Sequence, residues 1–178
     1  MPPTVRPSGV ERTFGRDEII VSKTDPQGRI TYANDVFCRM AAMSEAEILG
    51  QPHNVIRHPD MPRGVFGLLW ETIQRGEDIF AYVVNLAADG SHYWVLAHVT
   101  PTVDASGRIT GYHSNRRNPD RSSVAEIQGL YALLLAEEGR HGGAVAAAAA
   151  GRQYLSDLLE EKGRTYDELL WSVTREAV

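Results

Sequence analysis

The most informative segment of the sequence lies at residues 50–62 and reads Gly50-Gln51-Pro52-His53-Asn54-Val55-Ile56-Arg57-His58-Pro59-Asp60-Met61-Pro62. Its prolines remove backbone donors and disfavour helix in the residues before them, so it forms neither a long helix nor a strand. A rigid segment dense in donors and ionisable groups is usually shaped around something. The following stretch, Phe66-Gly67-Leu68-Leu69-Trp70, predicts a helix with an apolar face. Together they would make a wall for a planar polar ligand.

Around this segment, the sequence predicts two strands, a helical block and three more strands. The strands are expected at residues 18–23, 29–33, 79–87, 91–103 and 108–115. Turn chemistry at residues 25–28, 88–90 and 104–107 separates neighbouring strands. This order suits an α+β fold with a five-stranded antiparallel sheet and helices on one face.

The predicted helical block begins at two capping residues. Asn34 can cap a short helix that contains Phe37, and Ser44 opens a capping box with Glu47. A longer helix is expected from about Arg63 to Arg75, where Gly76 stops it.

After residue 120 the chain is predicted to be helical. A capping box at residues 123–126 would open the first helix of this part, whose apolar stripe follows helical spacing. The alanine-rich run at 144–150 predicts a second helix, and Thr165 with Glu168 would cap a third. The sequence therefore divides into an N-terminal cap at 1–17, a sensor domain at 18–119 and a helical extension at 120–178.

Composition narrows the functional classes. The formal net charge of −5 argues against nucleic acid, because no basic stripe offers phosphate contacts. The single cysteine, Cys38, excludes an internal disulfide and fits a reducing compartment. No apolar run approaches the roughly 20 residues that span a bilayer, and residues 1–15 do not read as a secretion signal. We therefore expect a cytoplasmic protein with no membrane span.

Several motifs together resemble the PAS domain of bacterial aerotaxis receptors. They are the run from Gly50 to Met61, Trp70, Asn85, and Asp89-Gly90-Ser91-His92-Tyr93-Trp94-Val95. The resemblance runs from about residue 24 to 140. It implies a PAS fold with strand order 2-1-5-4-3, non-covalent FAD, and sensing of redox state or oxygen in an aerotaxis or chemotaxis system. The chain departs from the family pattern at Ile79-Phe80-Ala81.

The resemblance and the residue chemistry together give a set of candidate cofactor-binding residues. An arginine suits a phosphate or a carbonyl edge, and a carboxylate accepts from ribose or ring N–H. Amides could face the edge of the ring. The set is Asn34, Arg57, His58, Asp60, Phe66, Trp70, Asn85 and Tyr93.

Structural roles compete for most of these residues. Asp60 could cap the next helix and pair with Arg57, and Asn34 could serve only as a helix cap. Trp70 has the spacing of a core residue. Asn85 lies within an apolar strand and needs a polar partner. Tyr93 lies on the opposite strand face from Trp94.

Other functions are weaker readings of the same sequence. A heme sensor would need an axial histidine, and a light sensor of the adduct-forming kind would need a cysteine beside the flavin, where Cys38 is not expected. Metal-ligand spacings and catalytic motifs are lacking, so we expect no metal and no enzyme activity. The alternative is a PAS interaction module with no cofactor or with heme. The C-terminal helices would either fold back on the sensor domain or form a homodimer or a docking surface for a signalling partner.

Overall fold

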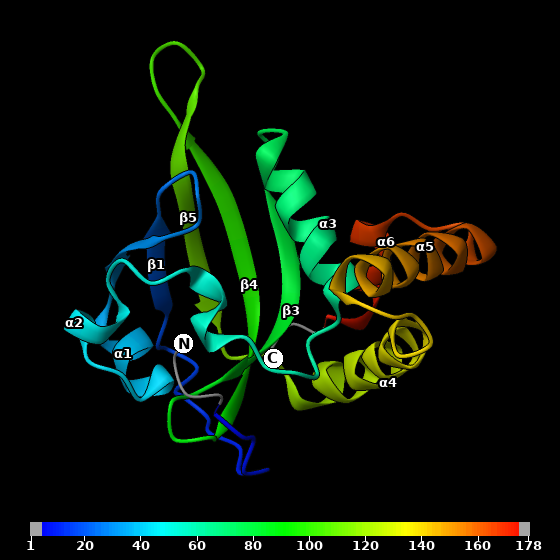
Figure 1. Cartoon of the computed structure of the whole chain (residues 1–178), viewed down its shortest axis with the longest axis horizontal. Coiled ribbons are helices and arrows are strands. Elements are labelled where there is room, and N and C mark those ends of the chain that lie inside the picture. The colour runs from blue at the N-terminus through cyan, green and yellow to red at the C-terminus, as the bar shows by residue number, and fades with distance from the viewer. Residues whose placement is uncertain (1–4, 175–178) are drawn as a thin grey trace.

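The computed structural model describes residues 5–174 and contains one five-stranded antiparallel sheet (Figure 1). The strands are β1 (Ile20–Thr24), β2 (Ile30–Ala33), β3 (Ile79–Leu86), β4 (His92–Val103) and β5 (Ile109–Arg117). Their order across the sheet is β2-β1-β5-β4-β3, which confirms the expected α+β architecture. No helix in residues 5–174 has the length and apolar character needed to cross a membrane.

The helical block follows β2 as predicted. It comprises α1 (Asp35–Ala41), α2 (Glu45–Ile48), the 3₁₀ turn η1 (His53–Ile56) and α3 (Arg63–Gln74). The Asn34 side chain accepts from the backbone N–H of Phe37, and Ser44 forms the capping box with Glu47. The proline-rich segment therefore supports only one short 3₁₀ turn before the chain enters α3.

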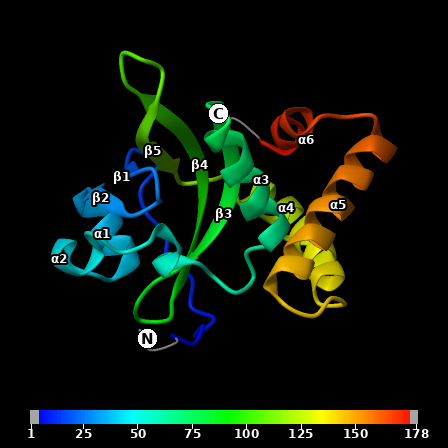
Figure 2. The ribbon, with the colours of Figure 1, turned by 45° about the horizontal axis from the view of Figure 1, so that its top comes forward.

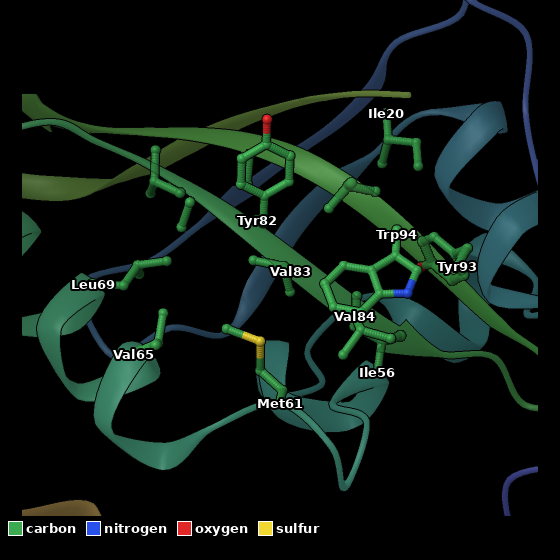
Figure 3. Close-up of a cluster of buried hydrophobic side chains, with 14 of the residues drawn as sticks. Ile20, Ile56, Met61, Val65, Leu69, Tyr82, Val83, Val84, Tyr93 and Trp94 are labelled. Atoms are coloured by element: carbon green, nitrogen blue, oxygen red, sulfur yellow. The ribbon is translucent and has the colours of Figure 1, made fainter. Parts of the chain in front are cut away.

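The two faces of the sheet carry different side chains because neighbours on a strand alternate. Figure 3 shows Tyr82 and Val83 of β3 on opposite sides of the strand, while Met61, Val65 and Leu69 point toward the sheet from the segment before α3 and from α3. We call the face toward α3 the inner face and the opposite face the outer face.

The N-terminal segment is extended and bonded to the sheet. The backbone N–H of Ser8 donates to Gly90 O at 2.8 Å, and that of Arg12 donates to His92 O at 2.7 Å. Arg12 also pairs with Asp89 at 2.8 Å, and Phe14 is buried. Residues 5–16 of the predicted N-terminal cap are thus extended and attached to the sheet, and residues 1–4 lie outside the described part.

Three C-terminal helices fold back on the sensor domain beside β3 and α3 (Figure 2). They are α4 (Arg121–Glu138), α5 (Ala144–Lys162) and α6 (Tyr166–Val173). The prediction that residues 123–126 open the first of them is wrong, because Asp120 accepts from the N–H groups of Ser122 and Ser123 and starts the helix earlier. The predicted cap at Thr165 and Glu168 is confirmed.

The free edge of β3 is covered by tyrosines from these helices. The hydroxyl of Tyr131 in α4 donates to Tyr82 O at 2.5 Å, and that of Tyr166 in α6 donates to Phe80 O at 2.9 Å. An exposed strand edge is a template for pairing with another chain. The C-terminal helices therefore satisfy carbonyl groups that would otherwise be open at this edge.

One carboxylate joins the C-terminal helices to α3. Glu138, the last residue of α4, is buried and accepts from the N–H of Arg63 at 3.0 Å and of Gly64 at 2.8 Å. The residue before α3, Pro62, offers no side-chain cap, so Asp60 does not cap this helix. A Cβ on Gly64 would lie 2.5 Å from the backbone N of Arg152, which shows how closely α3 and α5 pass.

This cap predicts a stability difference between two adjacent glutamates. We expect Glu138→Gln to lower the free energy of unfolding by about 1–2 kcal/mol, because it weakens a charge-assisted cap at a buried helix start. Glu137→Gln is the matched control, since Glu137 makes surface ion pairs with Arg140 and His141. Urea denaturation of both variants measures the difference, and equal midpoints would contradict the role given to Glu138.

Candidate functional site

A cavity lies between the inner face of the sheet, η1 and α3. Its walls combine apolar side chains with a few polar groups, which is the usual make-up of a small-molecule site. The lining residues are Ser22, Thr24, His53, Ile56, Arg57, Phe66, Leu69, Trp70, Ile73, Val83, Asn85, Ala97, Val99, Tyr112, Ser114 and Arg116.

Four of the lining residues carry buried polar atoms without a hydrogen-bond partner among residues 5–174. They are Thr24 Oγ1, Arg57 Nε, Asn85 Nδ2, and Arg116 Nε and Nη1. All except the Thr24 hydroxyl are pure donors. Buried donors normally find partners, and leaving one unsatisfied costs about 1–3 kcal/mol. The cavity therefore suits a ligand with several acceptor atoms.

The polar end of the cavity is built from β1, β5 and η1. Arg116 Nη2 donates to Ser22 Oγ, which in turn lies 3.2 Å from His53 Nε2. The His53 ring packs edge-on against Phe37, and although the residue is partly exposed, burial of the ring together with the nearby Arg116 cation lowers the pKa of His53 to about 3. Burial also lowers the pKa of Arg116, to about 10, which leaves it cationic at neutral pH. Arg116 is thus the charged group at this end and His53 is neutral.

Two half-buried aromatic residues of α3 form another wall. Trp70 meets Tyr112 of β5 edge to face with 5.6 Å between ring centroids. A Cβ on Gly28 would lie 2.7 Å from Trp70 Cη2, so the β1–β2 turn needs glycine here. Arg57 lies over the Phe66 ring at 5.3 Å. Phe66 therefore connects the proline-rich segment to α3, and Trp70 connects the first hairpin to α3.

Comparison with known proteins identifies this arrangement. The family described as PAS fold matches residues 19–114. The chain belongs to the PAS family. The matched region contains β1 to β4, most of β5 and α3, but ends before Arg116 and the C-terminal helices.

Two curated relatives are similar to this PAS domain. The aerotaxis receptor of Escherichia coli (strain K12) is 41% identical over 118 residues, covering 66% of this chain and 23% of the receptor. The nitrogen fixation regulatory protein of Klebsiella pneumoniae is 30% identical over 108 residues, covering 61% of this chain and 22% of the regulator. The chain therefore spans less than a quarter of the length of each relative.

A solved structure shares the fold. The light-state structure of the blue-light photoreceptor Aureochrome1 LOV has a TM-score of 0.54 and 24% identity, covering 64% of this chain and 88% of the other.

Half of the predicted site residues line the cavity of this PAS domain. Arg57 and Phe66 contribute from the proline-rich segment and α3, Trp70 from α3, and Asn85 from β3. Asn85 has its Nδ2 without a partner among the described residues, as a polar residue in an apolar strand would if its partner were a ligand. The fold brings Asn85 of β3 to the three residues of the proline-rich segment and α3.

The other predicted residues lie elsewhere. Asn34 caps α1 and bonds to the backbone of Ile19 and Val21, so its amide is fully engaged. Tyr93 is on the inner face and Trp94 packs against Tyr131 of α4 on the outer face, which confirms their opposite orientation. Tyr93 does not line the cavity, although burial raises the pKa of its phenol to about 12.

His58 and Asp60 face a second cavity beside α4 and the N-terminal segment. His58 Nδ1 accepts from the N–H of Asp60 at 3.0 Å, so the neutral ring carries its proton on Nε2. Burial lowers the pKa of His58, which favours this neutral form. Arg57 does not pair with Asp60 but donates to Met61 O at 3.1 Å.

Sequence reasoning missed the polar residues that β1 and β5 contribute. Ser22, Ser114 and Arg116 line the cavity, yet none belongs to a motif. The signal was the alternation Tyr112, Ser114, Arg116, which places three polar-tipped side chains on one face of a strand. A buried arginine could not be inferred from that alternation alone, because either face could have been the inner one.

His53 predicts a pH dependence of stability for the ligand-free protein. Its pKa is depressed on folding, so the unfolded chain binds a proton below about pH 6.5 that the folded chain refuses down to about pH 3. Stability from this residue is complete above pH 6.5 and falls as pH drops, by at most about 1.4 kcal/mol per pH unit. We expect His53→Gln to flatten this slope in urea denaturation between pH 6.5 and 4.5. The exposed His141→Gln is the control, and equal slopes for wild type and His53→Gln would contradict the assignment.

Proposed function

We propose that this PAS domain is a cytoplasmic sensory module that binds FAD non-covalently and reports redox state or oxygen to a partner by conformational change. The observation that carries the proposal is the donor-rich polar end and apolar walls of the inner cavity. The resemblance to aerotaxis-receptor PAS domains supports FAD as the ligand. The module acts through contact, not through an enzymatic reaction.

The chemistry of the donors fits the flavin ring. The ring is flat and apolar on its faces and carries carbonyl oxygens and ring nitrogens along one edge. Ile56, Leu69 and Val83 supply apolar walls, while Arg57, Asn85 and Arg116 supply donors that no protein acceptor uses within residues 5–174. Bound FAD would supply reversible electron transfer, and the protein's own residues would bind, orient and shield the ring.

Heme is a weaker second candidate, which rests on His53. This histidine lines the cavity and is neutral, as an axial ligand must be. Its Nε2, however, lies 3.2 Å from the Ser22 hydroxyl and is engaged there. An adduct-forming light sensor is also disfavoured, because Cys38 lies on α1 and does not line the cavity.

The C-terminal helices are the proposed output. They contact the start of α3 through Glu138 and the edge of β3 through Tyr131. Both α3 and β3 contribute residues to the cavity. Exposed Leu133, Val145 and Trp171 offer apolar surface on these helices. A homodimer through the helices or the PAS surface, and docking of a signalling protein there, remain proposals. The fold-back contacts are compatible with both.

The cofactor proposal is tested by titrating ligand-free protein with FAD and following absorbance and flavin fluorescence. Wild type should take up one FAD per chain and become yellow. Arg57→Gln and Asn85→Ala should each weaken binding by about tenfold, since each removes a donor facing the cavity. The exposed Arg63→Gln and Asn54→Ala are matched controls and should bind like wild type.

FMN serves as a second probe in the same titration. His58 and Asp60 line the second cavity and are close in sequence to Arg57 of the first, so the longer tail of FAD would extend toward them. We expect His58→Ala and Asp60→Ala to weaken FAD more than FMN. Folded wild type that stays colourless with both nucleotides, or that gives a Soret band with hemin, would refute the flavin proposal.

A further inference from the structure

Arg116 is a buried cation that lacks a carboxylate partner in the described part of the chain. It is 2% exposed, and neither a salt bridge nor a hydrogen bond to an acid involves it within residues 5–174. Its protein contacts are the Ser22 hydroxyl and the face of the Phe37 ring, 4.8 Å from the guanidinium carbon. Buried charges are normally paired, because removing them from water costs several kcal/mol.

The surroundings of Arg116 do not neutralise it. From β1 and η1 it meets Ser22 and the neutral His53, from β5 it has Ser114 on the same face, and from β4 the phenol of Tyr93 is near enough to affect its pKa. None of these groups carries a negative charge at neutral pH. The positive charge at the polar end of the cavity is therefore not compensated by any of the residues that the structure describes.

A hydrogen bond fixes the orientation of the Arg116 guanidinium. Because Nη2 donates to Ser22 Oγ, the Ser22 hydroxyl proton is free to bond to His53 Nε2. These hydrogen bonds hold the Nη2 atom of the guanidinium in place. Nε and Nη1 remain as free donors on a side chain that lines the cavity. Nε–H and Nη1 lie on different edges of the guanidinium, so each can donate to a separate acceptor in the cavity.

We propose that Arg116 is the charge-stabilising residue of the cavity and binds the reduced, negatively charged ring more tightly than the neutral oxidised ring. The inference rests on the proposed flavin function. Uptake of two electrons and one proton by a neutral ring leaves one net negative charge on it. A fixed cation in a water-poor cavity favours that state over the uncharged one.

The test compares reduction midpoints of FAD-loaded proteins, with dithionite as the electron donor, solvent as the proton source and a redox dye as the reference. Arg116→Gln removes the charge, and Arg116→Lys retains it without the fork. Arg117→Gln is a matched control, because it makes the same change at the next residue of β5, which is exposed on the outer face. Binding of oxidised FAD is titrated separately for every variant, and circular dichroism confirms that each is folded.

We expect Arg116→Gln to lower the preference for the reduced over the oxidised form by about tenfold or more, which for a two-electron couple is about 30 mV toward negative potential. Arg116→Lys should retain most of the preference, and Arg117→Gln should match wild type. Equal loss of affinity for both forms, or an unchanged midpoint in Arg116→Gln, would overturn the inference while leaving flavin binding intact. Wild type that binds no FAD would instead overturn the proposed function.

Discussion

The main constraint on the structure is a set of donors, buried between the sheet and α3, that have no acceptor among residues 5–174. Arg116, Asn85 and Arg57 come from β5, β3 and the segment before α3, and they converge on one cavity. Each such group weakens the folded state, so the surrounding apolar core must hold them in place. Met61, Val65 and Leu69 on the helical side and Val83 on the sheet do so (Figure 3). A ligand that supplies acceptors would turn this cost into binding energy.

The C-terminal helices brace the same region from outside. Glu138 caps α3 at its start, which follows directly on the proline-rich segment, and Tyr131 and Tyr166 cover the edge of β3. A shift of α3 or β3 caused by events in the cavity would therefore meet a buried carboxylate and two tyrosine hydroxyls before reaching solvent. These contacts connect α4 and α6 to α3 and β3, which both border the cavity.

Much of this fold was readable from local patterns, because alternation, caps and glycine turns are local signals. The strand order came from the family resemblance, and four of the eight predicted site residues line the cavity. What escaped prediction depends on contacts distant in sequence. The cap on α3 comes from Glu138, 74 residues away from Gly64, and the nearby Asp60 that could have served does not. Asn34 bonds to the backbone of Ile19, Val21 and Phe37 and not to the cavity, and Arg116 becomes conspicuous only once β5 is known to turn that face inward.

We infer that Arg116 serves a ligand in the cavity and destabilises the ligand-free fold. Thermal unfolding of wild type and Arg116→Met, each with and without FAD, tests it most directly. We expect ligand-free Arg116→Met to unfold at a higher temperature than ligand-free wild type, because an unpaired buried charge is gone. We also expect FAD to raise the unfolding temperature of wild type more than that of the variant. A variant that is less stable without ligand and is stabilised by FAD as much as wild type would contradict the claim, since Arg116 would then be a structural residue.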